Sequence, residues 1–325
     1  MKINQFLKFE PILKEKVWGG NKLTTLLNKS SLLNKIGESW EVSNVKNNIS
    51  IVANSTLKGT PLNELLKKHK SDLVGKKVYK KFGDNFPLLI KFIDANKPLS
   101  IQVHPNDELA KKRHNSFGKT EMWYVLDAED NANIIIGFNK KVSKQEYLNH
   151  LNHKTLTDIL NVDTVNSGDV YFIPTGRIHA IGAGVLLAEI QQSSDITYRV
   201  YDWDRPNLDG SFRELHTEEA MDAIDFSVQE SYKTTYTKKD NQPSELVDCS
   251  YFTTNFLSVN GSIEKNNALK DSFVIYMCVK GNVEFSYKDH SEILNFGQTI
   301  LVPASLEEFM ISSDRESELL EIYIK

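Results

Sequence analysis

Apolar and polar residues alternate over one short segment in the first third of the chain. In PLSIQVHPN (residues 98–106), every second position is apolar, and the positions between carry Ser100, Gln102 and His104. This period of two predicts a β-strand with one apolar face and one face that presents a hydroxyl, an amide and an imidazole. Pro105 cannot donate to a sheet, so the strand should end there. We therefore expect Gln102 and His104 to share one face at a strand end.

Short apolar or alternating runs recur along the chain and predict a mainly β protein. PLLIKFI (87–93) is almost continuously apolar, as in a strand buried on both faces, so Lys91 must either extend outward or face a site. We expect 134–138 to pair with 118–126 as a hairpin. Many short strands with tight turns indicate jelly-roll β-sandwiches. The other predicted strands are 37–42, 169–174, 184–192, 195–203, 252–259, 272–279, 283–287, 298–302, 308–311 and 319–324.

The remaining segments predict an N-terminal extended arm, turns and a few peripheral helices. The arm covers 6–11, and the glycine pair of VWGG (17–20) predicts a turn. A polar stretch, 233–243, reads as a linker. It divides the chain into a metal-binding unit, residues 1–235, and a C-terminal β unit, residues 236–325. The predicted helices are 61–70, a short one beginning at 106, 142–160 and 216–226.

A weak internal repeat relates the two expected units. The segment GDVYFIP (168–174) resembles GQTILVP (297–303), since both run from Gly through a strand to Pro. Five residues after the proline, the first copy has His179 and the second has Glu308. We infer two related β units, of which only the first carries a metal.

Composition and charge narrow the class of protein. The 325 residues carry a formal net charge of −4, which argues against a nucleic-acid binder. Neither a long apolar run nor an N-terminal signal pattern is present, so we expect a cytoplasmic protein that does not enter a membrane. The two cysteines, Cys249 and Cys278, are too few for a disulfide framework or a cysteine-rich zinc site.

Four side chains form the leading candidate for chemistry. Gln102 and His104 share a strand face, Glu121 lies on a strand expected to neighbour theirs, and His179 ends a third strand. Two imidazoles, a carboxylate and an amide oxygen suit a divalent ion such as zinc. The spacing alone is also compatible with histidines that merely complete a core or a surface.

A rival pair, His150 and His153, shares a face of a predicted helix. No third ligand obviously completes this pair, which favours a solvated helix face. The basic run 111–114 has two interpretations as well, a solvated helix end or a phosphate site.

Charged residues around the first set also have two interpretations. Lys119 should share a strand face with Glu121, Arg199 lies in a strand between aromatic residues, and Glu189 lies among apolar residues. They could form a buried ion-pair network. Alternatively, they could line a pocket for an anionic substrate, because Arg and Lys recognise phosphate.

Five segments within the first 205 residues are informative together: VWGG (17–20), GESWEV (37–42), PLLIKFIDANKPLSIQVHPND (87–107), GKTEMWYVLDA (118–128) and IPTGRIHAIGAGVLLAEIQQSSDITYRVYDWDR (173–205). Together these segments resemble the type I mannose-6-phosphate isomerases of the short bacterial form, which belong to the cupin superfamily. The resemblance implies a cupin-type jelly roll, a sugar-phosphate substrate and one zinc ion per chain bound by Gln102, His104, Glu121 and His179. It also places the family's essential arginine at Arg199 and its site lysine at Lys119.

The implied reaction interconverts mannose 6-phosphate and fructose 6-phosphate through an enediolate. Glu189, Lys119 and a metal-bound water are candidates for the base, while Ser100, Lys119 and Arg199 are candidates for binding substrate. Two other functions stay open: a metal-dependent cupin oxygenase, and a sugar-phosphate-binding regulator without catalysis. The sequence leaves the choice between monomer and homodimer undecided.

Overall fold

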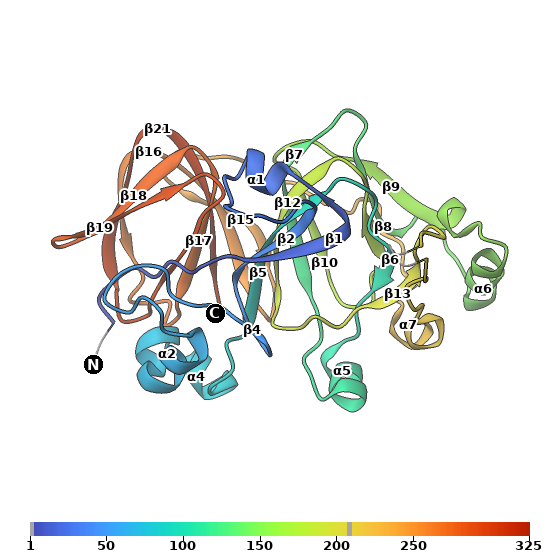
Figure 1. Cartoon of the computed structure of the whole chain (residues 1–325), viewed down its shortest axis with the longest axis horizontal. Coiled ribbons are helices and arrows are strands. Elements are labelled where there is room, and N and C mark those ends of the chain that lie inside the picture. Colours follow the sequence, from blue (N-terminus) through green and yellow to red (C-terminus); the bar gives the residue numbers. More distant parts are fainter. Residues whose placement is uncertain (1–2, 207–209) are drawn as a thin grey trace.

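The computed structural model describes residues 3–206 and 210–325, and it consists of two β units side by side (Figure 1). This confirms the prediction of a mainly β, jelly-roll-like fold. One sheet of the first unit has seven antiparallel strands, of which β12 lies at the centre. In spatial order they are β1 (Ile12–Gly20), β2 (Ile36–Val42), β5 (Leu88–Ala95), β12 (Val185–Gln192), β7 (Glu121–Ala128), β10 (Val170–Ile173) and β14 (Lys233–Thr234).

A second, five-stranded sheet completes the sandwich of the first unit. Trp123 and Tyr171 from the larger sheet pack with Ile134 and Ile181 from the smaller one in a core between them. The smaller sheet therefore covers the inner face of β7 and β12, on which Glu121 and Glu189 lie. Its strands, in spatial order, are β13 (Tyr198–Tyr201), β6 (Ile101–Val103), β11 (His179–Ile181), β8 (Asn133–Phe138) and β9 (Leu160–Thr164).

The second unit, built from β15 to β21, encloses a core that includes Phe285, Ile311 and Leu319. Residues 308–323 form one long strand, whereas two separate strands were predicted there. This strand, β21, pairs with β16, and a register shift at Val259/Gly261 of β16 lets the two strands bend around this core. The strands are β15 (Pro243–Asp248), β16 (Thr253–Asn266), β17 (Val274–Lys280), β18 (Asn282–Tyr287), β19 (His290–Asn295), β20 (Thr299–Val302) and β21 (Glu308–Tyr323).

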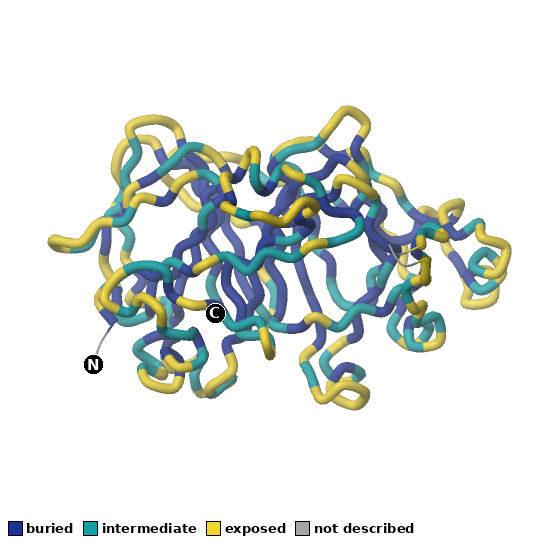
Figure 2. Tube along the Cα trace, in the orientation of Figure 1, coloured by how far each residue is buried: buried dark blue, intermediate teal, exposed yellow. Residues whose placement is uncertain are grey.

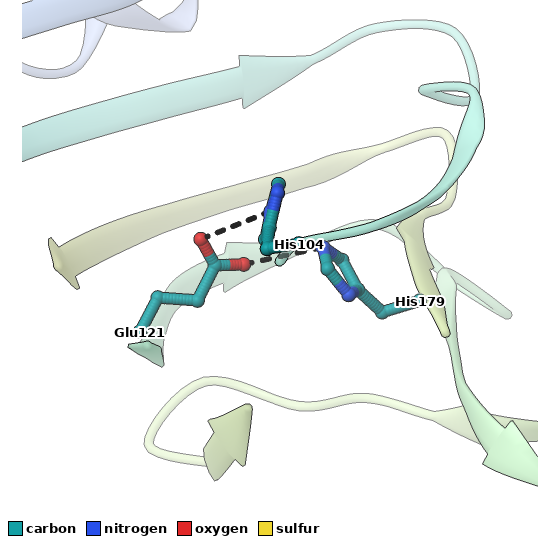
Figure 3. Close-up of side chains that lie close together, drawn as sticks. All are labelled: His104, Glu121 and His179. Carbon is teal, nitrogen blue, oxygen red and sulfur yellow. Dashed lines mark ion pairs between the residues drawn. The ribbon is translucent and has the colours of Figure 1, made fainter. Parts of the chain in front are cut away.

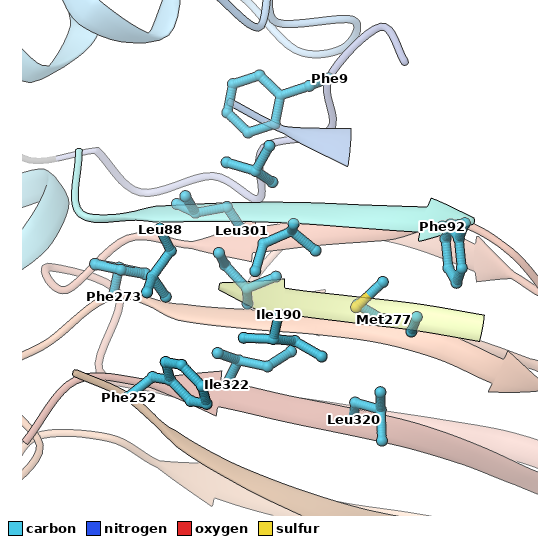
Figure 4. Packing of buried hydrophobic residues seen from close by; sticks show 14 of the residues in the cluster. Phe9, Leu88, Phe92, Ile190, Phe252, Phe273, Met277, Leu301, Leu320 and Ile322 are labelled. Carbon is cyan, nitrogen blue, oxygen red and sulfur yellow. The ribbon is translucent and has the colours of Figure 1, made fainter. Parts of the chain in front are cut away.

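The seven-stranded sheet of the first unit packs face to face on the main sheet of the second. Phe92 and Ile190 meet Met277, Leu320 and Ile322 in one continuous apolar cluster between the sheets (Figure 4). The expected N-terminal arm lies against the second unit, where Leu7 pairs with Leu301. Figure 2 shows the consequence: the strands at the centre of the molecule are buried and the loops at its rim are exposed.

The helices are short and lie at the periphery (Figure 1). None of them, within the described ranges, is long and apolar enough to cross a membrane. The prediction of one helix over 142–160 is wrong: the helix ends at Asn152, Lys154 adopts a φ of +58°, and the chain then enters β9. The helices are α1 (Lys22–Thr25), α2 (Leu62–His69), α3 (Ser71–Val74), α4 (Lys76–Phe82), α5 (Asp107–His114), α6 (Lys144–Asn152), the 3₁₀ turn η1 (Leu156–Ile159) and α7 (Thr217–Ala223); a small hairpin joins β3 (Asn44–Val45) to β4 (Asn48–Ile49).

The predicted hairpin between 118–126 and 134–138 is wrong as well. β7 pairs with β10 and β12, whereas β8 pairs with β9 and β11 in the opposite sheet. The connection between β7 and β8 therefore crosses from one layer of the sandwich to the other. For the same reason Glu121 does not neighbour the strand of His104 within a sheet but faces it across the interior.

The glycine pair at 19–20 does not make the predicted turn, because β1 continues through Gly20. Both glycines are required by close packing instead. A Cβ on Gly19 would lie 2.5 Å from the amide nitrogen of Gly37, and one on Gly20 would lie 2.5 Å from a carboxylate oxygen of Asp94.

Candidate metal centre and substrate cavity

Two histidines and a glutamate meet inside the first sandwich. His104 follows β6, His179 begins β11, and Glu121 begins β7 in the facing sheet. Nε2 of His104 lies 3.5 Å from Oε2 of Glu121, and Nε2 of His179 lies 3.3 Å from Oε1 (Figure 3). All three side chains are buried. The structure thus joins three of the four predicted ligands from both layers of the sandwich.

The predicted alternation in β6 explains how His104 reaches this interior. Ile101 and Val103 are fully buried in the apolar cluster on the outer side of the five-stranded sheet, under α6 and α7. The intervening side chains therefore point inward. The amide Nε2 of Gln102 lies 3.2 Å from Nε2 of His179, which places the fourth predicted ligand at the same centre.

Backbone carbonyls hold both imidazole rings in the orientation that a metal requires. Nδ1 of His104 donates to the carbonyl of Ile196 at 2.9 Å, and Nδ1 of His179 donates to that of Arg177 at 2.8 Å. These donors assign the proton to Nδ1 and leave the Nε2 lone pair toward Glu121. Burial lowers the pKa of both rings, that of His104 to about 3, so both are neutral.

The carboxylate of Glu121 is buried and incompletely satisfied. Neither of its oxygens accepts a hydrogen bond of good geometry within the described residues, although Nζ of Lys119 lies 2.9 Å from Oε2. Burial opposes ionisation, but the charge of Lys119 holds the pKa of Glu121 well below its usual range. Two neutral imidazoles and an under-bonded carboxylate fit a divalent cation.

A cavity of about 440 Å³ adjoins this centre, and Gln102 and Lys119 contribute to its wall. Lys119 connects the two, because its Nζ also lies 3.1 Å from Nε2 of His104. The cavity wall carries a surplus of cationic side chains, which suits an anionic ligand. Its lining comprises Lys14, Lys16, Trp18, Glu38, Trp40, Lys91, Ile93, Leu99, Ser100, Gln102, Lys119, Ile181, Glu189, Asp195, Thr197, Arg199 and Arg213.

Arg199, on β13, is a cavity cation with few internal partners. Its Nη1 donates to the carbonyl of Glu214 at 2.7 Å, whereas its buried Nε finds no acceptor among the residues that the structure describes. Within the described ranges, no carboxylate lies within 4 Å of its guanidinium. The nearby Asp202 instead binds Arg205 and Arg213. Arg199 is therefore not a member of the ion-pair network that was one interpretation of its surroundings.

Glu189 and Lys91, by contrast, do form such a network. Nζ of Lys91 lies 3.0 Å from Oε1 of Glu189, and the indole of Trp123 donates to Oε2 at 3.0 Å. Burial opposes the charge of Lys91, but Glu189 and Glu38 raise its pKa. Lys91 thus faces the site, and Glu189 can accept a proton only by weakening one of these bonds.

Other candidates lie away from the centre. Within the described ranges, no cluster of possible ligands includes His150 or His153; His150 binds Thr155 and His153 is exposed. The basic end of α5 is also exposed, and Arg113 there binds Asp222. Sequence reasoning missed Arg213 in the cavity wall, because its segment has no strand or helix pattern that would place it.

The comparisons with known proteins agree with this geometry. Residues 6–144 match the family model "phosphomannose isomerase type I, catalytic domain", and residues 243–323 match "mannose-6-phosphate isomerase, cupin domain". The chain is 34% identical to mannose-6-phosphate isomerase ManA of Bacillus subtilis over 95% of this chain and 96% of that protein. It is 32% identical to mannose-6-phosphate isomerase of Streptococcus mutans over 94% of each. The crystal structure of a Bacillus subtilis mannose 6-phosphate isomerase superposes with a TM-score of 0.88 at 33% identity, over 98% of this chain and 99% of that one.

Proposed function

Because the chain belongs to the type I phosphomannose isomerase family, as its sequence segments suggested, we propose that it interconverts mannose 6-phosphate and fructose 6-phosphate. The observation that carries this proposal is the buried His104–Glu121–His179 centre beside a cavity lined by cations. An aldose–ketose isomerase needs one site for the carbonyl end of the sugar and another for its phosphate. The centre and the cavity offer these two sites side by side.

We propose His104, Glu121, His179 and Gln102 as the residues that hold one zinc ion. A zinc ion held there would supply Lewis acidity to the reacting end of the sugar. The backbone carbonyls of Ile196 and Arg177 fix the orientation and the tautomer of the His104 and His179 rings before any metal binds. The side-chain amide of Gln102 can present its oxygen by a rotation of 180°.

The cavity residues would bind the open-chain sugar and its phosphate. Arg199 has an unused Nε donor and a fixed Nη1, which suits charge-assisted bonds to a phosphate or to the developing enediolate. Ser100 and Lys119 line the same cavity and are the other candidates for substrate contacts. Burial of the sugar among these side chains would exclude water from the proton transfer.

The proton moves between two neighbouring carbons, and we propose Lys119 or Glu189 as its carrier. Nζ of Lys119 lies beside two proposed ligands, 2.9 Å from Glu121 and 3.1 Å from His104. Glu189 is a carboxylate whose bonds to Lys91 and Trp123 must loosen before it accepts a proton. A positioned acid–base group contributes roughly 10²–10⁴-fold to such a reaction, so a variant of the true carrier should lose that factor in turnover.

A coupled isomerase assay on mannose 6-phosphate tests the proposal. It should be run on the protein as purified, after chelation, and after zinc is restored. We expect turnover that disappears with chelation and returns with zinc. A folded, zinc-loaded protein without turnover would contradict the isomerase function; sugar-phosphate binding would then favour the regulator, and iron with oxygen consumption the oxygenase.

Three further expectations accompany this function. We propose a division into a catalytic unit, residues 1–235, and a C-terminal unit, residues 236–325; the separate family-model matches at 6–144 and 243–323 support it. A sugar-phosphate substrate favours a cytoplasmic location. Size-exclusion chromatography with light scattering would decide between monomer and homodimer.

A further inference from the structure

The segment that carries Lys119 and Glu121 has little secondary structure of its own. β7 begins only at Glu121, and the amide of Lys119 is 3.3 Å from the carbonyl of Pro105. Gly118 is pressed against 105–107, where a Cβ would lie 2.7 Å from the amide nitrogen of Asp107. Glu121 is anchored by its pairing with Ile173 and Gln191, whereas residues 118–120, which carry Lys119, depend on side chains that bind them from outside the segment.

Gln192, at the end of β12, binds Thr120 on both sides of its backbone. The side-chain Oε1 of Gln192 accepts from the amide of Thr120 at 2.9 Å, and the amide of Gln192 donates to the carbonyl of Thr120 at 3.1 Å. Both residues are buried. Gln192 thus fixes the one residue that separates Lys119 from Glu121.

Asp107, the first residue of α5, fixes Gln192 and the start of the same segment. Its Oδ1 accepts from Nε2 of Gln192 at 3.0 Å and from the amide of Gly118 at 2.8 Å. Because a carboxylate only accepts, it forces Gln192 to aim Nε2 at Asp107 and Oε1 at Thr120.

The last member of this network comes from the other unit. Tyr251, in the turn between β15 and β16, donates its hydroxyl to Oδ2 of Asp107 at 2.8 Å. Burial and the adjacent Asp107 raise the pKa of Tyr251 to about 12, so the hydroxyl stays protonated at neutral pH. Burial opposes ionisation of Asp107, but bonds from Tyr251 and Gly118 hold its pKa below the usual value.

We propose that Tyr251 of the C-terminal unit is a positioning residue, which acts through Asp107 and Gln192 to hold Lys119 and Glu121 in place for metal binding and turnover. The activity part of this inference rests on the proposed function. It gives the C-terminal unit a part in the site although it supplies no candidate ligand. A hydrogen bond to a charged acceptor is worth roughly 10- to 150-fold in an equilibrium constant. Because Tyr251 acts through two intermediate residues, we expect a several-fold effect at the site.

The test compares Tyr251→Phe with Tyr236→Phe. Tyr236 also donates its hydroxyl, at 2.9 Å, to the carbonyl of Gly168 in the first unit, but within the described residues it makes no hydrogen bond to 118–121. Phenylalanine differs from tyrosine only by the missing hydroxyl, and Tyr251 borders a cavity of about 690 Å³ rather than a closed core, so the variant should fold. Three quantities are measured: hydrogen exchange of a peptide that covers 118–121, zinc affinity by chelator competition, and kcat at saturating zinc.

We expect Tyr251→Phe to speed exchange at 118–121, weaken zinc binding about 3- to 10-fold and lower kcat by a similar factor. Asp107→Ala should cost about 10- to 100-fold in zinc affinity. Tyr236→Phe should leave all three quantities unchanged. The inference is overturned if Tyr251→Phe changes exchange only around 249–252 and matches Tyr236→Phe in zinc affinity. Because exchange and zinc affinity need no turnover, they decide this inference even if the isomerase proposal fails.

Discussion

Each unit contains one copy of the repeated Gly-to-Pro segment, 168–174 in the first and 297–303 in the second. Both copies pair with a neighbouring strand in the same register, so positions in the two units can be matched residue by residue. In the first unit Ile173 of the repeat faces Glu121 on β7; in the second, Val302 at the matching position faces Val274 on β17. The proposed metal ligand Glu121 thus corresponds to a valine. The second unit fills the equivalent interior with apolar side chains and has no candidate metal cluster within its described residues.

A buried carboxylate bonded to an aromatic donor, however, occurs in both units. Glu189 faces Trp123 in the first unit, and Glu321 faces Tyr276 at the corresponding positions of the second. The hydroxyl of Tyr276 donates to Glu321 at 2.8 Å, as the indole of Trp123 donates to Glu189 at 3.0 Å. This pair therefore belongs to the common architecture, whereas the ligands distinguish the first unit.

The most disruptive test of this comparison converts the first unit toward the second. Glu121→Val removes a ligand and leaves Lys119 without its partner at 2.9 Å. We expect zinc content and turnover to fall by more than the roughly 10–100-fold typical of a residue outside the ligand set. Metal analysis and the coupled assay measure this, with circular dichroism as the test of folding.

Val274→Ala in the second unit is the matched control. It truncates the corresponding interior position and should lower stability by roughly 2 kcal/mol through lost packing. Zinc content should stay at the wild-type level. Loss of zinc from Val274→Ala but not from Glu121→Val would reverse the assignment of the metal to the first unit.

Arg199→Ala tests whether the cavity cations act on the substrate rather than on the metal. We expect kcat/KM to fall roughly 10²-fold, because preorganised charge near the reacting atoms is lost. Zinc content should change little, and Arg199→Lys should recover only part of the loss because it lacks the forked donor geometry. Turnover of Arg199→Ala within threefold of wild type would refute the role of this residue.

Matched substitutions at the shared carboxylate separate architecture from chemistry. Glu189→Gln removes the carboxylate bound to the buried Lys91, and Glu321→Gln removes the buried carboxylate that lies 2.6 Å from the partly buried Lys265. Each should lower the free energy of unfolding by about 3 kcal/mol. Only Glu189→Gln should also reduce turnover, and an equal loss of turnover in both variants would contradict the distinction between the units.

Acid titration of Glu321 gives the finest comparison. Burial opposes its ionisation, but Lys265 and Lys270 lower its pKa from 4.5 to about 2. The folded state therefore binds this proton less readily than the unfolded state, and the resulting stability, roughly 3 kcal/mol, is complete above about pH 4.5. It should decline as the pH falls from 4.5 toward 2. Urea unfolding over this pH range gives the free energy of unfolding of wild type and of Glu321→Gln. The difference between these two free energies should shrink toward acid pH, and a constant difference would contradict the lowered pKa.

Local patterns predicted what depends on neighbours in the chain. The alternation around β6 placed Gln102 and His104 on one inward face, because strand periodicity is a backbone property. The continuous apolar run of β5 likewise indicated a strand covered on both sides. The resemblance to a known family then identified Glu121 and His179 as partners of His104, which spacing alone had left open.

Features that depend on the arrangement of layers could not be predicted. The choice of β12 rather than β8 as the partner of β7 is decided by how two sheets share apolar faces. The glycines of β1 are explained by the approach of Gly37 and Asp94, which are distant in sequence. Arg213 and Tyr251 reach their positions through irregular segments, so no periodic pattern marks them.

The central claim is that the first unit alone holds the metal on which turnover depends. Anomalous diffraction at the zinc absorption edge, from crystals of zinc-loaded protein, tests it most directly. We predict one strong anomalous peak per chain among His104, Glu121 and His179. A peak in the second unit, or none at this centre in a zinc-loaded and active protein, would contradict the account.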